Sequence, residues 1–207
     1  MLKNILLVIL KIAIILVIII VFTIGFNHEQ DIDDFAYAVA IGIDSGDSNN
    51  LKVHFQFTRP SSSGGEGSGG SGAAQTYIYT VDASSVSSAI NLVNNYISKQ
   101  INLSHCKVLV ISEELAYNKG IEKEVYTLIN DVQLRPDTGL IISKCDSKYF
   151  IENSKPTFET LVSKYYEIVP ATTEITGYTA YIKISDFFNQ LKSNFSEPCA
   201  ILRWCKF

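Results

Sequence analysis

An apolar run near the N-terminus constrains this chain more than any other feature. From Ile5 to Phe26 the only charged residue is Lys11, and the run is 22 residues long. About 20 helical residues cross a hydrocarbon core of roughly 30 Å. Lipid offers the backbone no hydrogen-bond partners, so such a segment forms a helix even when it is rich in Ile and Val. We therefore expect residues 1–30 to be an N-terminal transmembrane anchor and its flank, held in membrane lipid by Ile5 to Phe26.

The lysines predict how this anchor is oriented. Lys3 and Lys11 lie on its N-terminal side, and positive charge favours the cytoplasmic side of a membrane. The rest of the chain is then extracytoplasmic. A cleaved signal peptide is the alternative, but it has a shorter apolar core and a small-residue cleavage site, which Thr23-Ile24-Gly25 matches poorly. A lipoprotein would need a Cys directly after the run, and the first Cys is Cys106.

Composition limits the kind of domain that the anchor carries. The 207 residues are enough for the anchor and one ordinary domain. Apolar residues make up 47% of the chain and charged residues 18%, with much of the apolar excess in the anchor. The formal net charge of -4 argues against a nucleic-acid partner, which favours a basic face.

The first part of the domain reads as an antiparallel hairpin. Phe35–Ile43 is an apolar run of strand length, and Asp44–Asn50 is a dense cluster of turn formers. Leu51–Thr58 then alternates between apolar and polar residues, which predicts a half-buried strand. Its expected core face is Leu51, Val53, Phe55 and Phe57, and its expected polar face is Lys52, His54, Gln56 and Thr58.

A Gly/Ser-rich segment interrupts the strands. Ser61–Gly72 contains six of the twelve glycines, so it lacks the apolar side chains needed to bury a core. Strand-like sequence resumes at Thr76–Val81. We therefore expect residues 61–74 to be a mobile loop inside one domain of residues 31–202.

Helical and strand patterns alternate after the loop. Apolar residues recur every three or four positions from Val86 to Ile101, behind N-cap residues at 82–85. The pattern predicts further helices over Glu113–Asn118, Ile121–Val132, Ser147–Asn153, Thr157–Glu167 and Asp186–Lys192, with Gly120 as a C-cap, and strands over Lys107–Ile111 and Leu140–Cys145. The fold class is thus α/β, as a mixed α+β domain with one mixed sheet and several helices.

The four cysteines match no CxxC metal pattern. Cys106 and Cys145 lie in apolar strand-like runs, which favours buried free thiols. Pairing outside the cytoplasm is the alternative.

Two acidic segments have side chains of the kind that bind cations. Asp31, Asp33 and Asp34 could bind a divalent cation, but charged residues beside an anchor are usually solvated. Asp44–Asn50 has the acids and amides of a calcium loop without its terminal Glu or its spacing, so a plain turn is favoured. We expect no metal.

The sequence contains none of the common catalytic motifs. GxSxG, HExxH, GxGxxG and P-loop patterns do not occur. His105 and Cys106 are adjacent at a strand start, so their side chains should point to opposite faces and not form a nucleophile–base pair. We therefore predict that the chain is not an enzyme and holds no cofactor.

Several segments, in order, resemble one family. The segments are Ala38–Asp44, Thr58–Pro60, Leu103–Val108, Val110–Ala116, Gly120-Ile121, Arg135-Pro136, Ser185–Leu191 and Glu197–Leu202. From about Asp31 to Leu202 the chain resembles the N-terminal part of a Ger(x)C-type spore germination protein, the C subunit of nutrient germinant receptors. The motif positions, whose roles are unknown, are Gly42, Asp44, Arg59, Pro60, Ser104, His105, Lys107 and Gly120.

The resemblance implies a membrane complex. The C subunit lies on the outer face of the spore inner membrane, beside an integral-membrane A subunit and a permease-like B subunit. The complex responds to amino acids or other small nutrients, and nutrient binding is usually assigned to the B subunit. The resemblance therefore implies a non-catalytic subunit that acts through protein–protein contacts.

Two departures from the family separate this chain from typical members. Those members are lipoproteins with a lipobox Cys, whereas this chain has a transmembrane segment. They also continue through further domains, whereas Arg203–Phe207 is expected to be an unmatched tail of a truncated or frame-disrupted subunit. A stand-alone solute-binding or interaction domain on an anchor is the alternative function, and a hydrolase lacks a nucleophile, base and orienting group.

Overall fold

The computed structural model describes residues 2–25, 34–47, 51–58, 76–154, 159, 161–177, 181–203 and 205. The chain divides into two compact units, Met1–Asp34 and Phe35–Phe207. Several sequence-based expectations lie outside the described residues, namely those for Asp31, Asp33, Arg59, Pro60 and the loop 61–74.

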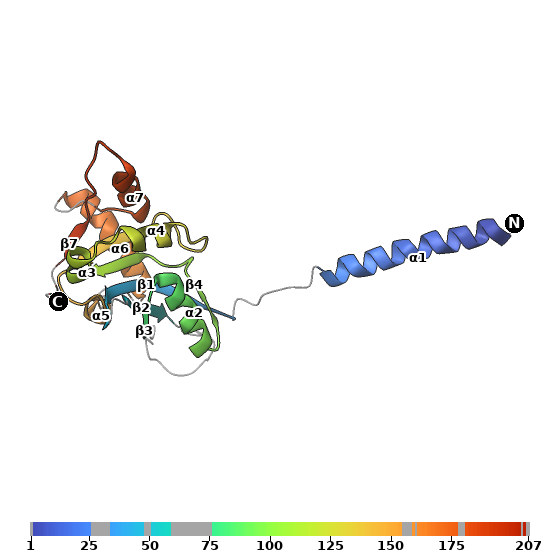
Figure 1. Cartoon of the computed structure of the whole chain (residues 1–207), viewed down its shortest axis with the longest axis horizontal. Coiled ribbons are helices and arrows are strands. Elements are labelled where there is room, and N and C mark those ends of the chain that lie inside the picture. Colours follow the sequence, from blue (N-terminus) through green and yellow to red (C-terminus); the bar gives the residue numbers. More distant parts are fainter. Residues whose placement is uncertain are drawn as a thin grey trace. The chain divides into compact units, whose positions relative to one another are not determined.

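The first unit contains helix α1 (Leu2–Gly25) (Figure 1). The segment Lys3–Phe22 is long and apolar enough to cross a membrane, with a mean hydropathy of 3.6. Its side chains are exposed along its whole length. Apolar side chains on every face of a helix require an apolar surrounding, so this helix is a candidate membrane anchor, as expected.

The second unit contains a mixed sheet of seven strands among the described residues. The strands are β1 (Phe35–Ser45), β2 (Leu51–Thr58), β3 (Thr76–Ala83), β4 (Gln100–Asn102), β5 (Val108–Ser112), β6 (Gly139–Ser143) and β7 (Ile201–Arg203). They lie in the order β3-β2-β1-β5-β6-β7, and β4 pairs with the start of β1. The β1–β2 pair is antiparallel, which confirms the predicted hairpin, whereas β1, β5, β6 and β7 run parallel to one another.

Helices cover both faces of this sheet. The helices of the second unit are α2 (Val86–Tyr96), α3 (Glu113–Asn118), α4 (Glu122–Ile129), α5 (Ser147–Asn153), α6 (Val162–Thr176) and α7 (Ile184–Lys192). Apolar residues of α2, α3, α4 and α7 join the larger core cluster, and residues of α5 and α6 join the smaller one. Adjacent strand residues are divided between the two clusters, Leu109 in the larger and Val108 in the smaller. The domain is therefore a three-layer α/β structure, which confirms the predicted α/β class; the second helical layer was not part of that prediction.

The second helical layer corrects the prediction for β2. His54 and Gln56 were expected on a polar, solvated face, but both are buried. The face that carries them belongs to the layer formed by α5 and α6, and Tyr166 of α6 donates a hydrogen bond to Gln56 Oε1 over 3.1 Å. The alternation in this strand therefore does not distinguish a core face from a solvent face. One face packs in the larger apolar cluster, and the other makes buried polar contacts beneath the second helical layer.

Some element boundaries also differ from prediction. The helix expected up to Ile101 ends at Tyr96, and Ile101 lies in β4 with its N–H bonded to Asn94 Oδ1 over 2.8 Å. Val132 was expected in a helical stripe but is fully exposed beyond α4. There the Asp131 side chain accepts a hydrogen bond from the Gln133 N–H, which stabilises a turn instead of a helix. The helices over Glu113–Asn118 and Ser147–Asn153 are confirmed.

One disulfide overturns part of the cysteine prediction. Cys145 was expected to be a free buried thiol, but it is bonded to Cys205. Strand β7, which sequence patterns did not indicate, pairs with β6 and brings the two cysteines together. Cys106 is free and buried, as predicted, and Cys199 is free and exposed.

Removal of this disulfide should destabilise the domain. The bond closes a loop with a sequence separation of 60 residues, for which loop-closure entropy gives a stabilisation of about 4 kcal/mol at most. We expect Cys145→Ser to lower the free energy of unfolding of the full chain in detergent by about 2–4 kcal/mol. Urea unfolding with and without a reductant measures this. The exposed Cys199→Ser should match wild type, and a Cys145→Ser variant as stable as wild type would contradict the assignment.

Candidate functional site

Asp44, one of the predicted motif positions, lies near the carboxyl end of β1 beside the first turn of α5. Its Oδ1 accepts a hydrogen bond from the backbone N–H of Ser147 over 2.7 Å, and its Oδ2 accepts one from the backbone N–H of Lys148 over 3.4 Å. The N-cap residue Asp146 makes no side-chain capping bond. Asp44 therefore supplies, from 103 residues earlier in the chain, the negative capping group that the helix N-terminus favours.

His54 and Thr80 extend this arrangement across the sheet. The Asp44 Oδ2 and His54 Nε2 atoms lie 3.0 Å apart, and His54 Nδ1 lies 2.8 Å from the Thr80 hydroxyl. An ionised carboxylate can only accept, so Nε2 carries the hydrogen, and in the neutral ring Nδ1 accepts from Thr80. One chain of hydrogen bonds thus joins α5, β1, β2 and β3.

The Asp44 carboxyl is held ionised by these contacts. Burial acts to raise its pKa, but the hydrogen bond from His54 and the backbone N–H of Ser147 outweigh burial and leave the pKa below its ordinary value of 3.8. The carboxylate is therefore the hydrogen-bond acceptor for both His54 Nε2 and the Ser147 N–H.

Gly42, a second motif position, makes room for α5. A Cβ atom at this position would lie 2.6 Å from Ser147 Oγ and 2.8 Å from Ile151 Cδ1. Both contacts are closer than real Cβ atoms show, so with a larger residue here the Ser147 and Ile151 side chains, or the helix itself, would have to shift. Gly42 and Asp44 act on the same helix, one by leaving space and the other by capping.

Ser104, His105 and Lys107 form a separate group in the turn between β4 and β5. Ser104 donates its N–H to Asn102 Oδ1 over 2.9 Å, and the His105 ring meets Tyr37 edge-on with ring centroids 4.5 Å apart. The Lys107 N–H donates to the Val39 carbonyl over 2.9 Å. These contacts fasten the turn to β1.

The remaining motif positions do not join either group. Gly120 follows α3 with a φ of 74°, the left-handed conformation that commonly ends helices, which agrees with its predicted capping role. Arg59 and Pro60 lie outside the described residues. The motif positions that the structure describes thus serve several local backbone features and do not meet in one pocket.

Cys106 has no catalytic partner in the described part of the chain. Burial raises the pKa of its thiol to about 12, and Sγ donates to the Val108 carbonyl over 3.5 Å. The neighbouring His105 is exposed and contacts Ser104 and Tyr37. The predicted divergence of the two side chains is confirmed, and a thiolate–imidazole pair is excluded here.

Thr80, His54 and Asp44 do follow the bonding order of a hydroxyl–imidazole–carboxylate triad, which sequence reasoning did not find. The His54 side chain is enclosed, with both ring nitrogens already bonded, so it could exchange a proton with a substrate only through Thr80. The pairing of strands in the predicted hairpin could have indicated that these residues lie together. His54 is paired with Gly42 and Thr80, which places Asp44 diagonally on the same face.

Comparison with known proteins identifies what the chain is similar to. Residues 28–203 match the model of the family described as the spore germination protein N-terminal domain. A curated relative, spore germination protein KC of Bacillus subtilis (strain 168), is 21% identical over 122 residues, which cover 58% of this chain and 30% of the relative. The matched region is therefore less than a third of that relative's length. No solved structure matches.

The lowered pKa of Asp44 predicts how stability depends on pH. A carboxyl whose folded-state pKa is depressed stabilises the fold above its unfolded pKa and loses that contribution as pH falls through the folded value. We expect Asp44→Asn to cost about 2–4 kcal/mol at pH 7, because a buried hydrogen-bonded charge is lost. The difference in free energy of unfolding between Asp44→Asn and wild type should persist down to about pH 5 and shrink below about pH 4.

Urea unfolding of both proteins from pH 7 to pH 3 measures this difference. Thr80→Val is the matched control, since it removes the His54–Thr80 bond but keeps the carboxylate at the helix. Its difference from wild type should change little over the same acidic range. A wild-type advantage over Asp44→Asn that does not change with pH would show that Asp44 is not held ionised by these contacts.

Proposed function

The chain belongs to the family of the spore germination protein N-terminal domain, and from that premise we propose that it is a non-catalytic, membrane-anchored subunit of a nutrient germinant receptor. The observation that carries the proposal is the extent of the match, which covers residues 28–203 and hence nearly the whole second unit. The apolar helix α1 precedes it and is a candidate membrane anchor. A germination role and a membrane location are thus supported by independent parts of the chain.

The proposed location is the spore inner membrane, with the domain facing outward. Lys3 and Lys11 in the anchor favour a cytoplasmic N-terminus, and the Cys145–Cys205 disulfide fits an oxidising compartment outside the cytoplasm. Membrane A and B subunits are the proposed partners, by resemblance to the receptor C subunits. The domain would then contribute through contacts with these subunits, and the nutrient would bind elsewhere in the complex.

A non-catalytic role accords with the chemistry of the described residues. The Cys106 thiol is buried and has a raised pKa, and the His54 imidazole is enclosed between two partners. No group of three or more His, Cys, Asp or Glu side chains in the described residues could hold a metal ion. The hydrogen bonds of His54 instead join strands β1, β2 and β3.

Genetic replacement in the spore-forming source organism tests the proposal. We expect deletion of the gene to reduce or abolish germination in response to at least one nutrient, and we expect the full chain to restore it. A chain without Leu2–Gly25 should fail to restore it, whereas a chain with an unrelated transmembrane helix in that place should succeed. Affinity purification of the restored chain from spore membranes should recover multi-spanning A and B subunits.

Unchanged germination of the deletion strain across amino acids, sugars and nucleosides, together with recovery of no multi-spanning partner, would contradict the proposal. Immunoblots of spore membranes establish that each variant is present, so a loss of response is not confused with a loss of protein.

A further inference from the structure

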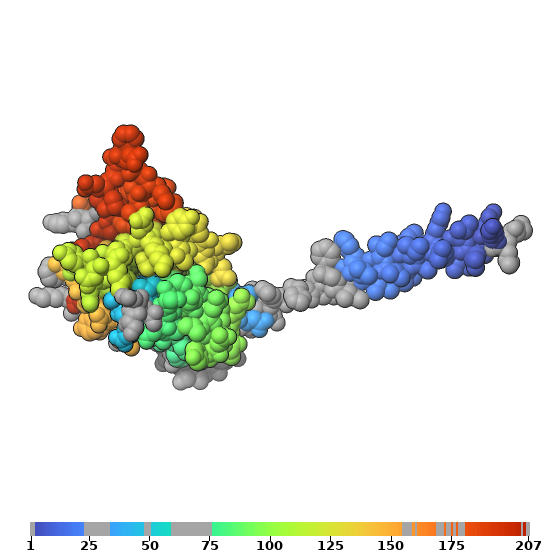
Figure 2. Space-filling model, in the orientation of Figure 1, coloured from blue at the N-terminus to red at the C-terminus, as the bar shows by residue number. Residues whose placement is uncertain are grey.

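The α2–β4 turn, residues Tyr96–Gln100, lies at the end of the domain where the chain enters it. Strand β4 runs parallel to Phe35–Tyr37, the first residues of β1. Figure 2 shows the green α2–β4 region directly beside the blue start of β1. This surface therefore adjoins the point at which the N-terminal segment is covalently attached to the domain.

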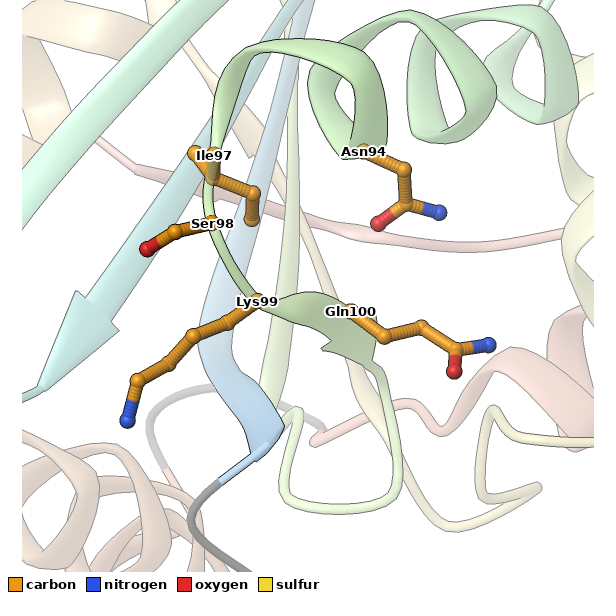
Figure 3. Close-up of a pocket in the computed structure, with 5 residues that line it drawn as sticks. All are labelled: Asn94, Ile97, Ser98, Lys99 and Gln100. Carbon is orange, nitrogen blue, oxygen red and sulfur yellow. The ribbon is translucent and has the colours of Figure 1, made fainter. Parts of the chain in front are cut away.

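The turn presents an aromatic side chain and a cation. Tyr96 is 78% exposed, and Lys99 is also exposed. Asn94, Ile97, Ser98, Lys99 and Gln100 line a shallow open hollow, from which the Lys99 side chain extends away from the backbone (Figure 3). Tyrosine and lysine beside a half-buried apolar residue such as Ile97 are the combination found at membrane–water interfaces.

The covalent connection restricts how far this turn can be from lipid. Nine residues, 26–34, separate the end of α1 from Phe35. A fully extended chain spans about 3.5 Å per residue, so the start of β1 cannot be more than about 35 Å from the end of α1. Such a tether gives a millimolar effective concentration, at which individually weak contacts are populated.

We propose that the α2–β4 turn docks on the headgroup layer of the membrane that holds α1, with Tyr96 at the interface and Lys99 against the phosphate of an anionic phospholipid. The proposal rests on the membrane anchoring proposed above. Asp31, Asp33 and Asp34 precede β1 in the sequence and are repelled by anionic lipid, whereas Lys99 is attracted to it. Docking is therefore weak, dependent on anionic lipid and sensitive to salt.

Tryptophan substitution in the full chain tests the docking. The chain has one Trp, so Trp204→Phe provides a background without tryptophan. In this background Tyr96→Trp is compared with Tyr117→Trp, a matched position that is 89% exposed on α3. Helix α3 begins at the opposite, carboxyl end of the parallel strands. Both proteins are placed in nanodiscs containing anionic lipid brominated near the headgroup end of the acyl chains.

The fluorescence of Tyr96→Trp should fall at least about twofold relative to unbrominated nanodiscs, as expected for an indole at the interface, while Tyr117→Trp should be unaffected. Adding Lys99→Glu should lower the ratio of docked to undocked domain about fivefold or more. Replacing the anionic lipid of the nanodiscs by zwitterionic lipid should lower this ratio to a similar extent. Inorganic phosphate at millimolar concentration should not relieve the quenching, which distinguishes a lipid headgroup from a free phosphate ligand.

Equal quenching of the two tryptophans, or none at Tyr96→Trp in protein that co-purifies with the nanodiscs, would overturn the docking. Relief of the quenching by free phosphate would overturn the lipid assignment. Failure of the chain to co-purify with nanodiscs would instead refute the anchoring, so the two proposals fail by different observations.

Discussion

The contact between the Asp44 carboxylate and the first turn of α5 is the interaction on which the smaller helical layer depends. Helix α5 has seven residues, too few to be stable in isolation, and its own N-cap residue makes no side-chain capping bond. Asp44 provides that cap, and Gly42 leaves the space that the helix occupies. Phe150 and Ile151 of α5 can then pack in the smaller core cluster, over the face of the sheet that carries His54.

Much of this fold could be predicted from local pattern. The alternation in Leu51–Thr58 and the turn formers before it gave the hairpin, and the apolar spacing after Val86 gave α2. The burial of His54 could not be predicted, because alternation shows that two faces differ without showing whether solvent or a second layer covers the polar one. Only the hydrogen bonds to Asp44 and Thr80 make that burial favourable.

The predictions of a free thiol at Cys145 and of a helical Ile101 were wrong for the same reason. Strands β4 and β7 have three residues each, too short for a detectable period, and both are strands through pairing with a longer neighbour. The Cys145–Cys205 bond follows from one of these pairings. The candidate site was predictable in part, since Gly42 and Asp44 were identified as motif positions, whereas their common partner α5 is more than a hundred residues away in the chain.

These features describe a domain whose polar chemistry is directed inward. The polar network at Asp44 joins structural elements, while exposed groups such as Tyr96 and Lys99 lie near the entry of the chain. In the family member from Bacillus subtilis, the matched region is only one part of a longer chain. Substitutions at Asp44 or His54 should therefore change the stability of the fold, whereas substitutions at Tyr96 or Lys99 should change surface contacts alone.

Amide hydrogen exchange at Ser147 in the folded full chain tests most directly whether Asp44 holds α5 on the sheet. If it does, the Ser147 N–H, which donates to Asp44 Oδ1 over 2.7 Å, should exchange only through opening of the whole domain, at the same free energy as the N–H of Leu109 in the central strand β5. Exchange of Ser147 through a local opening several kcal/mol below that of Leu109 would contradict the account, because α5 would then detach while the sheet remained folded.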